Sequence, residues 1–144
     1  MSTGIQVTFD CADPGALSRF WAETLHYQLD APPEGFDSWE AALEAWGVPK
    51  EEWNSASAVV DPDGKGPRLF FQRVPEGKAV KNRLHLDLHV SAGPGASPED
   101  RKADIEPEVE RLRALGAERV EDHLKLNEYF VVMRDPEGNE FCVC

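Results

Sequence analysis

The turn sequence Asp61-Pro62-Asp63-Gly64 occurs a second time, with one conservative change, as Asp135-Pro136-Glu137-Gly138. Aspartate, proline and glycine in this order are typical of a tight turn, because proline fixes its own φ and glycine tolerates a positive one. The residues on either side of each turn are rich in β-branched and aromatic side chains, which predicts flanking strands. The strands predicted in this way are 55–60, 68–74, 129–134 and 140–144. The repeated hairpin indicates that the chain uses one structural unit twice.

The segment before each hairpin also follows one pattern. Apolar and polar residues alternate in 5–10 and in 83–90, as in a strand with one buried face. Asp13-Pro14 and Ser97-Pro98 then supply an N-cap and a first-turn proline for a helix. Each half therefore reads as strand, helix, strand, strand, turn and strand. The short strands that complete the two halves are predicted at 27–29 and 118–120.

These elements predict an α+β fold of paired βαβββ modules, which together form a curved mixed sheet around a cleft. We expect a single domain, 1–144, with module one at 4–75 and module two at 82–144. Pro107 falls inside the second predicted helix, where it predicts either a kink or a fresh helical start capped by Asp104.

A tryptophan-rich segment at 37–54 interrupts module one and is predicted to be a helical insert. Trp39 and Trp46 fall at helical spacing, and Trp53 follows on what reads as a second helical turn. Two interpretations stay open. The tryptophans can pack the insert onto the sheet, as large aromatic residues usually do, or they can form the aromatic wall of a ligand pocket.

Composition excludes several classes of protein. The chain has 144 residues with 27 acidic and 15 basic side chains, so its formal net charge is −12. Nucleic acid and anionic membrane partners require basic patches, so neither is expected. We expect no signal peptide, because Met1 leads almost directly into the first predicted strand. The three cysteines are Cys11, Cys142 and Cys144, an odd number without framework spacing, which fits a reducing cytoplasm.

Strand periodicity predicts which side chains face the cleft. Side chains on a strand alternate between its two faces, so the apolar residues Ile5, Val7, Phe9, Leu84, Leu86 and Leu88 should lie under the helices. The opposite face should then carry an imidazole, a carboxylate, a thiol and amides, which are the donors that a divalent metal site needs. The cleft-facing residues singled out in this way are Gln6, Gln72, His85, His89, Glu140 and Cys142, with Phe70 beside them.

A set of segments spread over nearly the whole chain carries a family resemblance. They are Asp10-Cys11-Ala12-Asp13-Pro14 with Phe20-Trp21, Asp61–Gly64, Arg68–Glu76, Asn82–Leu88 and Asp135–Cys142. With these residues the chain resembles a glyoxalase-like domain of the vicinal-oxygen-chelate superfamily, to which glyoxalase I, bleomycin-resistance proteins and extradiol dioxygenases belong. The resemblance implies paired βαβββ modules, a homodimer and metal ligands on the first and last strand of each module.

Transferred residue by residue, the resemblance implies the metal ligands Gln6, Gln72 and His85. The last strand of module two departs from the family pattern. Cys142 stands where the ligand glutamate usually stands, and Glu140 lies two residues earlier with the same strand parity. The predicted metal set is therefore His85, Gln72, Glu140, Gln6 and Cys142, and the metal would be nickel, zinc, iron or manganese.

Two functions follow as hypotheses, with a slight preference for the binding of a small molecule with an optional metal. In the first, the chain is a metal-dependent lyase, isomerase or dioxygenase that acts on a vicinal-oxygen substrate, with Glu140 as general base. In the second, it is a metal-free binding protein that holds a planar, preferably cationic molecule. The ligand-binding residues predicted for the cleft are Trp39, Trp46, Phe70 and His89, with Trp53 nearby. Thiol catalysis by Cys142 is a third, weaker reading, because no base adjacent in sequence would activate it.

Overall fold

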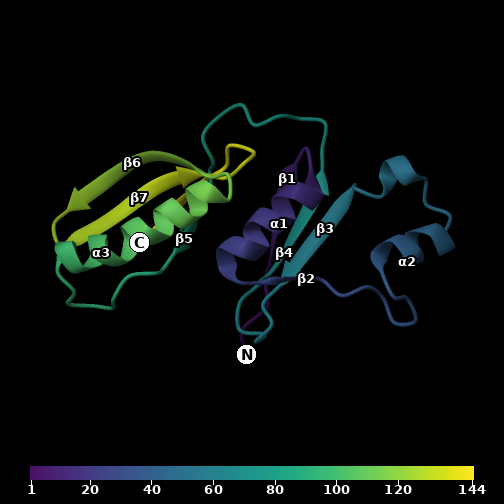
Figure 1. Ribbon diagram of the computed structural model, residues 1–144, viewed down its shortest axis with the longest axis horizontal. Helices are drawn as coiled ribbons and strands as arrows, with labels where there is room; N and C mark the ends of the chain where they lie inside the picture. Colours follow the sequence, from purple (N-terminus) through teal and green to yellow (C-terminus); the bar gives the residue numbers. More distant parts are fainter. The chain divides into compact units, whose positions relative to one another are not determined.

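A computed structural model describes all residues, 1–144, and divides them into two compact units (Figure 1). The N-terminal unit comprises Met1–Gly77 and the C-terminal unit comprises Lys78–Cys144. Each unit has its own four-stranded mixed sheet and its own long helix, and each is described by itself below.

The N-terminal unit contains β1 (Gln6–Cys11), α1 (Pro14–Leu25), β2 (Gln28–Leu29), β3 (Ala56–Val60) and β4 (Arg68–Arg73). Its strand order is β1-β4-β3-β2. β1 runs parallel to β4, whereas the other pairs are antiparallel. The parallel pair requires a long connection, which α1 and the following strands provide.

Local sequence explains how α1 begins and what it buries. The Asp13 carboxylate accepts a hydrogen bond of 3.1 Å from the Ala16 amide, and Pro14 occupies the first turn. Leu17 and Trp21 are each 1% exposed, because this face of the helix packs onto β3 and β4. The Trp21 ring lies 5.3 Å from the ring of Phe9 on β1, which extends the core across the sheet.

The insert between β2 and β3 is helical, as predicted. It consists of α2 (Trp39–Ala45) and the 3-10 turn η1 (Lys50–Glu52). The Ser38 hydroxyl caps α2 by accepting a hydrogen bond of 3.1 Å from the Ala41 amide. Only Ala42 is fully buried on α2, so this short helix contributes little to the core of the unit.

The C-terminal unit repeats the topology of the N-terminal unit. It contains β5 (Leu86–Leu88), α3 (Pro98–Ala114), β6 (Glu118–Lys125), β7 (Glu128–Arg134) and β8 (Glu140–Val143). The strand order is β5-β8-β7-β6, with β5 parallel to β8 and antiparallel pairing elsewhere. Figure 1 shows α3 lying along this sheet. The predicted α+β fold of paired βαβββ modules is therefore confirmed.

The two repeated turns use their first aspartate in the same way. The Asp61 carboxylate accepts hydrogen bonds from the amides of Asp63, Lys65 and Gly66. The Asp135 carboxylate accepts from the amides of Glu137 and Asn139. In both turns the fourth residue is a glycine with positive φ, 68° at Gly64 and 86° at Gly138. The repeat thus reflects a shared backbone conformation.

Several element boundaries differ from the prediction. β5 spans only three residues of the alternating segment 83–90, and β6 continues to Lys125. Ile5 and Leu84 were expected under the helices, but they are 74% and 71% exposed. Both residues precede the first paired residue of their strand. The alternation of apolar and polar residues in the sequence therefore extends beyond the residues that are hydrogen-bonded in the sheet.

Of the two alternatives predicted at Pro107, the fresh helical start capped by Asp104 was wrong. α3 is one helix from Pro98 to Ala114 and passes through Pro107. The Asp104 carboxylate accepts a hydrogen bond of 2.9 Å from the Ala92 amide instead of capping a helix. Ile105, Val109 and Leu112 are fully buried on either side of the proline. Their packing offsets the free-energy cost of the backbone hydrogen bond that a proline cannot donate.

Candidate functional site

Three side chains with metal-binding atoms meet at the paired strands β5 and β8 of the C-terminal sheet. The imidazole of His85, the carboxylate of Asp87 and the thiol of Cys142 each offer one ligand atom, and these atoms lie within 4.8 Å of one another. Asp87 stands opposite Cys142 in the parallel pairing of β5 with β8. His85 precedes Asp87 by two residues, and its Nε2 lies 3.3 Å from an oxygen of that carboxylate.

This group, His85, Asp87 and Cys142, borders a cavity of about 740 Å³ that lies within the C-terminal unit. Its walls come from the beginning and from the end of the unit's sequence. Loop residues 91–94 and the aromatic residues Tyr129 and Phe130 form part of the wall. The polar and ionisable residues that complete it are His89, Arg101, Glu128 and Cys144. Pockets of this size accommodate small organic ligands.

The two thiols at the cavity are protonated at neutral pH in the metal-free protein. Burial raises the pKa of Cys142 to about 11, and the negative charge of Asp87 adds to this effect. Burial likewise raises the pKa of Cys144, with further contributions from the charges of Asp87 and Glu128. The Cys144 sulfur lies 3.3 Å from Nδ1 of His89, so a second thiol and a second imidazole meet at the same cavity.

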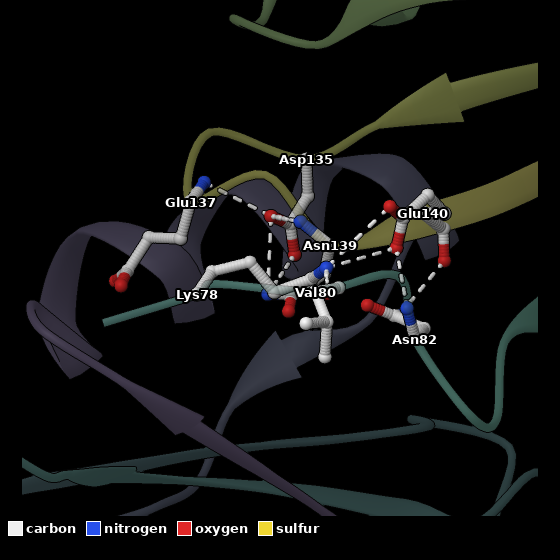
Figure 2. Close-up of polar contacts among 7 residues, drawn as sticks. All are labelled: Lys78, Val80, Asn82, Asp135, Glu137, Asn139 and Glu140. Atoms are coloured by element: carbon white, nitrogen blue, oxygen red, sulfur yellow. Dashed lines mark hydrogen bonds and ion pairs between the residues drawn. The ribbon is translucent and has the colours of Figure 1, made fainter. Parts of the chain in front are cut away.

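Glu140, predicted as general base and metal ligand, holds the segment that leads into β5 (Figure 2). Its carboxylate accepts a hydrogen bond of 3.0 Å from the Asn82 amide and forms an ion pair of 3.3 Å with Lys78. Lys78 also donates a hydrogen bond to the carbonyl of Val80. Burial alone would raise the pKa of Glu140, but the hydrogen bonds from Asn82 and Lys78 outweigh it and lower the pKa. These contacts make Glu140 a stable anion that anchors 78–82.

The two glutamines of the predicted metal set belong to the N-terminal unit. The side-chain carbonyl of Gln6 accepts a hydrogen bond of 2.8 Å from Arg68. The side-chain amide of Gln72 donates a hydrogen bond of 2.7 Å to Asp10. Both residues are exposed, whereas Leu69 and Phe71 on β4 are buried. Their participation in a metal site stays a prediction.

A second cavity, of about 760 Å³, lies within the N-terminal unit beneath the helical insert. Trp39 and Trp53 line it together with Phe70 of β4. Both indole nitrogens are engaged, with hydrogen bonds of 2.9 Å to the carbonyls of Asp30 and Val48. The two ring systems are therefore held in place at the cavity wall, and Lys50 Nζ lies 5.8 Å from the centroid of the Trp53 ring.

Trp46 and His89 take positions different from those of the other predicted ligand-binding residues. Trp46 does not line the cavity beneath the insert; it packs edge-on against Phe36, with ring centroids 5.7 Å apart, and is 55% exposed. His89 lies in the other unit, at the cavity bordered by His85. The structure thus assigns Trp39, Trp53 and Phe70 to one cavity and His85, His89 and Cys142 to another.

Sequence reasoning missed Asp87 as a metal-binding candidate, and it missed Arg101 as a cavity residue. The alternation of 83–90 had already placed Asp87 on the same face as His85 and His89, so the signal was present. Arg101 gave no such signal, because it lies on α3 and reaches the cavity only through the packing of that helix beside 91–94.

None of the helices combines the length and apolar character needed to cross a membrane.

Solved structures of known fold resemble this chain over nearly its full length. A glyoxalase/bleomycin resistance protein/dioxygenase family enzyme from Burkholderia phytofirmans PsJN has a TM-score of 0.62 and 16% identity, with 96% of this chain and 94% of that chain covered. The fosfomycin resistance protein FosX from Listeria monocytogenes has a TM-score of 0.64 and 10% identity, with 99% and 92% covered. A mutant of that FosX, in complex with Mn(II) and 1S,2S-dihydroxypropylphosphonic acid, has a TM-score of 0.61 and 11% identity, with 99% and 90% covered. At these identities the likeness establishes the fold alone.

Sequence comparison gives two further matches. A curated protein of Hypocrea virens (strain Gv29-8 / FGSC 10586), named glutamine--tRNA ligase protein virJ, is 33% identical over 75 residues. That match covers 49% of this chain, and it spans only 12% of the length of the curated protein. The glyoxalase-like domain family matches residues 6–144, which include both βαβββ modules and the two repeated turns. The chain therefore belongs to the glyoxalase-like domain family.

Proposed function

We propose that the C-terminal unit binds a divalent metal ion through His85, Asp87 and Cys142, and a small molecule in the adjoining cavity. The observation that carries this proposal is the convergence of the three ligand atoms within 4.8 Å at the wall of a cavity of about 740 Å³. The Mn(II) complex of the structurally similar FosX supports the proposal by analogy of fold.

The donor set favours zinc among the metals considered. An imidazole nitrogen, a carboxylate oxygen and a thiolate sulfur are all ligands of zinc, whereas manganese prefers oxygen donors. Three protein ligands leave a coordination position open, which is typical of zinc sites that bind a substrate or water. Cys142 has to lose its proton to serve as a ligand, so metal binding competes with a thiol pKa of about 11.

A metal ion bound here would act as a Lewis acid toward vicinal oxygens of the small molecule. The chain's own residues have separate tasks. Asp87 and His85 lie 3.3 Å apart and so form two neighbouring ligands of the ion, while Phe130 and loop 91–94 form part of the wall around the ligand. Glu140 acts as a positioning residue, because it fixes the segment that brings His85 to the cavity.

Metal titration tests this proposal. Protein freed of metal with a chelator should bind zinc with one ion per chain, as measured by isothermal titration calorimetry against a competing chelator. His85→Ala, Asp87→Asn and Cys142→Ser should each weaken zinc binding at least tenfold, a change of about 1.4 kcal/mol. His26→Asn serves as the control, since His26 lies at the C-terminal end of α1 in the other unit. Unchanged affinity in all three variants would contradict the proposal.

A second candidate function rests on the cavity beneath the helical insert. We propose that this cavity holds a planar aromatic cation between Trp39, Trp53 and Phe70, without a metal. Carboxylates outnumber basic groups in its lining, with Asp13, Asp30, Glu40 and Glu52 against Arg19 and Arg68. An aromatic wall beside carboxylates suits a cationic ring system.

Tryptophan fluorescence distinguishes this candidate from the first. Proflavine, a planar cation, should quench the tryptophan emission of the metal-free protein, whereas the anion 2-naphthoate should not. Trp53→Phe should reduce the quenching, and Trp46→Phe should leave the proflavine affinity unchanged because Trp46 lies outside the cavity lining. Equal affinity for both probes would count against the cationic class.

The homodimer implied by the family resemblance is part of the same proposal. Light scattering coupled to size-exclusion chromatography should give twice the chain mass of 16.0 kDa. A single species at the chain mass would contradict it.

A further inference from the structure

Arg101 is a cation without a carboxylate partner at the wall of the C-terminal cavity. Its Nη1 donates a hydrogen bond of 3.3 Å to the Ser91 hydroxyl, and its Nη2 donates one of 3.5 Å to the carbonyl of Gly93. Its Nε is buried and has no hydrogen-bond partner. The guanidinium is therefore held by two long contacts to neutral groups, and one of its donors is unsatisfied.

Arg101 forms no ion pair although the chain has 27 acidic residues. Other arginines form ion pairs with aspartate or glutamate, namely Arg68, Arg73, Arg111, Arg113, Arg119 and Arg134. The long hydrogen bonds of Nη1 and Nη2 to neutral acceptors leave these two groups able to exchange their partners for a stronger acceptor in the cavity. The strongest acceptor for a guanidinium is an anion.

We propose that Arg101 binds the anionic group of a small ligand in this cavity, and that the ligand's other oxygens reach the group formed by His85, Asp87 and Cys142. The planar guanidinium fork matches the oxygens of a carboxylate, phosphonate or phosphate, which it can hold with two parallel hydrogen bonds. The ligand class is thus a small anion that carries further oxygen donors. The second half of this inference rests on the proposed metal site.

The charges at the cavity are consistent with this assignment. The carboxylates of Asp87 and Glu128 and the guanidinium of Arg101 line the same cavity, so all three charges face one space. Arg101 is the only lysine or arginine in the cavity wall. Two carboxylates oppose an incoming anion, and a metal ion at Asp87 would offset one of them. Anion binding should therefore be weak in the metal-free protein and stronger after zinc is added.

Methylphosphonate is the probe, and its neutral diester, dimethyl methylphosphonate, is the matched control compound. Phosphorus NMR titrations of the full chain, metal-free and zinc-loaded, would give the affinity for each. Methylphosphonate should bind, zinc should strengthen its binding about tenfold, and the diester should not bind. Arg101→Gln should weaken methylphosphonate binding at least tenfold in both forms, whereas Arg101→Lys should retain part of the affinity.

Arg113→Gln is the matched control variant, because Arg113 lies on the same helix but outside the cavity and pairs with Glu110. It should bind methylphosphonate like the unchanged protein. A thermal unfolding midpoint near that of the unchanged protein shows that Arg101→Gln is folded, and Arg101→Lys provides the test if it is not.

The outcomes separate this inference from the metal site. If zinc does not bind but methylphosphonate binding depends on Arg101, the metal proposal fails and the anion site stands. If methylphosphonate does not bind with or without zinc, or if Arg101→Gln and Arg101→Lys both bind it as tightly as Arg113→Gln, the anion site is overturned.

Discussion

Asp87 and Cys142 face each other across the parallel pairing of β5 with β8, and the charge of the aspartate adds to burial in raising the pKa of the thiol. Strand pairing therefore brings together a carboxylate and a thiol that are far apart in sequence. Their closeness stabilises the protonated thiol, since two negative charges at this distance repel each other. The same closeness makes the pair suitable for a cation, which both groups can bind once the thiol has lost its proton.

The first prediction concerns the pKa of Cys142, which lies at about 11 because of burial and, after that, the charge of Asp87. Asp87→Asn removes that charge, so the pKa should fall and alkylation by iodoacetamide should begin at a lower pH. Fragment-ion mass spectrometry of the labelled C-terminal peptide would separate Cys142 from Cys144, and the peptide mass would separate both from Cys11. Asp63→Asn, an exposed change in the turn of the other unit, should not change the pH dependence of Cys142 alkylation. An unchanged profile in Asp87→Asn would show that the carboxylate does not act on the thiol.

The second prediction separates an anchoring role of Glu140 from a role as metal ligand. Glu140→Gln keeps the shape of the side chain but weakens the contacts to Asn82 and Lys78. Hydrogen exchange at 78–82 should become faster, while zinc affinity should change less than twofold. Lys78→Met should give the same exchange pattern. A loss of zinc affinity as large as that of His85→Ala would instead identify Glu140 as a ligand.

The third prediction concerns stability at low pH. Hydrogen bonds from Arg119 and then from Tyr129 lower the pKa of Glu106 to about 2, against an ordinary value of 4.5. A group whose pKa is lowered by folding stabilises the protein above its unfolded pKa. This contribution should be lost as the pH falls from 4.5 toward 2.

Glu106→Gln tests this contribution. The variant should lower the free energy of unfolding at pH 7 by about 1–3 kcal/mol, since it removes hydrogen bonds to a charged group that tie α3 to β6 and β7. Urea unfolding at pH 7 and at pH 2 would measure the effect, and the difference between the proteins should shrink at pH 2. Glu110→Gln, at an exposed pair with Arg113, should cost less than about 1 kcal/mol.

The fourth prediction concerns the repeated turn. Gly138 has a φ of +86°, a conformation that side chains with a Cβ rarely adopt. Gly138→Ala should therefore destabilise the protein by about 1 kcal/mol. Gly77→Ala is the control, because Gly77 has no positive φ and open space around its Cα, and it should be neutral or slightly stabilising. Equal denaturation midpoints for the two variants would contradict this explanation of the repeat.

The sequence determined the local elements and the faces of the strands. The repeated Asp-Pro-x-Gly turns, the capped helix starts and the alternation of polar with apolar residues predicted the paired βαβββ modules, which the structure confirms. These signals depend only on neighbouring residues, because turn, cap and strand conformations are set within a few positions of the chain.

Tertiary structure decided which chemical groups meet. Parity placed His85, Asp87, Glu140 and Cys142 on one face, but the pairing register set Asp87 beside Cys142 and left Glu140 bonded to Asn82. Arg101 reached the cavity through the packing of α3, and α3 stayed continuous through Pro107 because buried neighbours hold it. Strand register and helix packing depend on contacts between residues distant in sequence, and periodicity in a single sequence does not encode them.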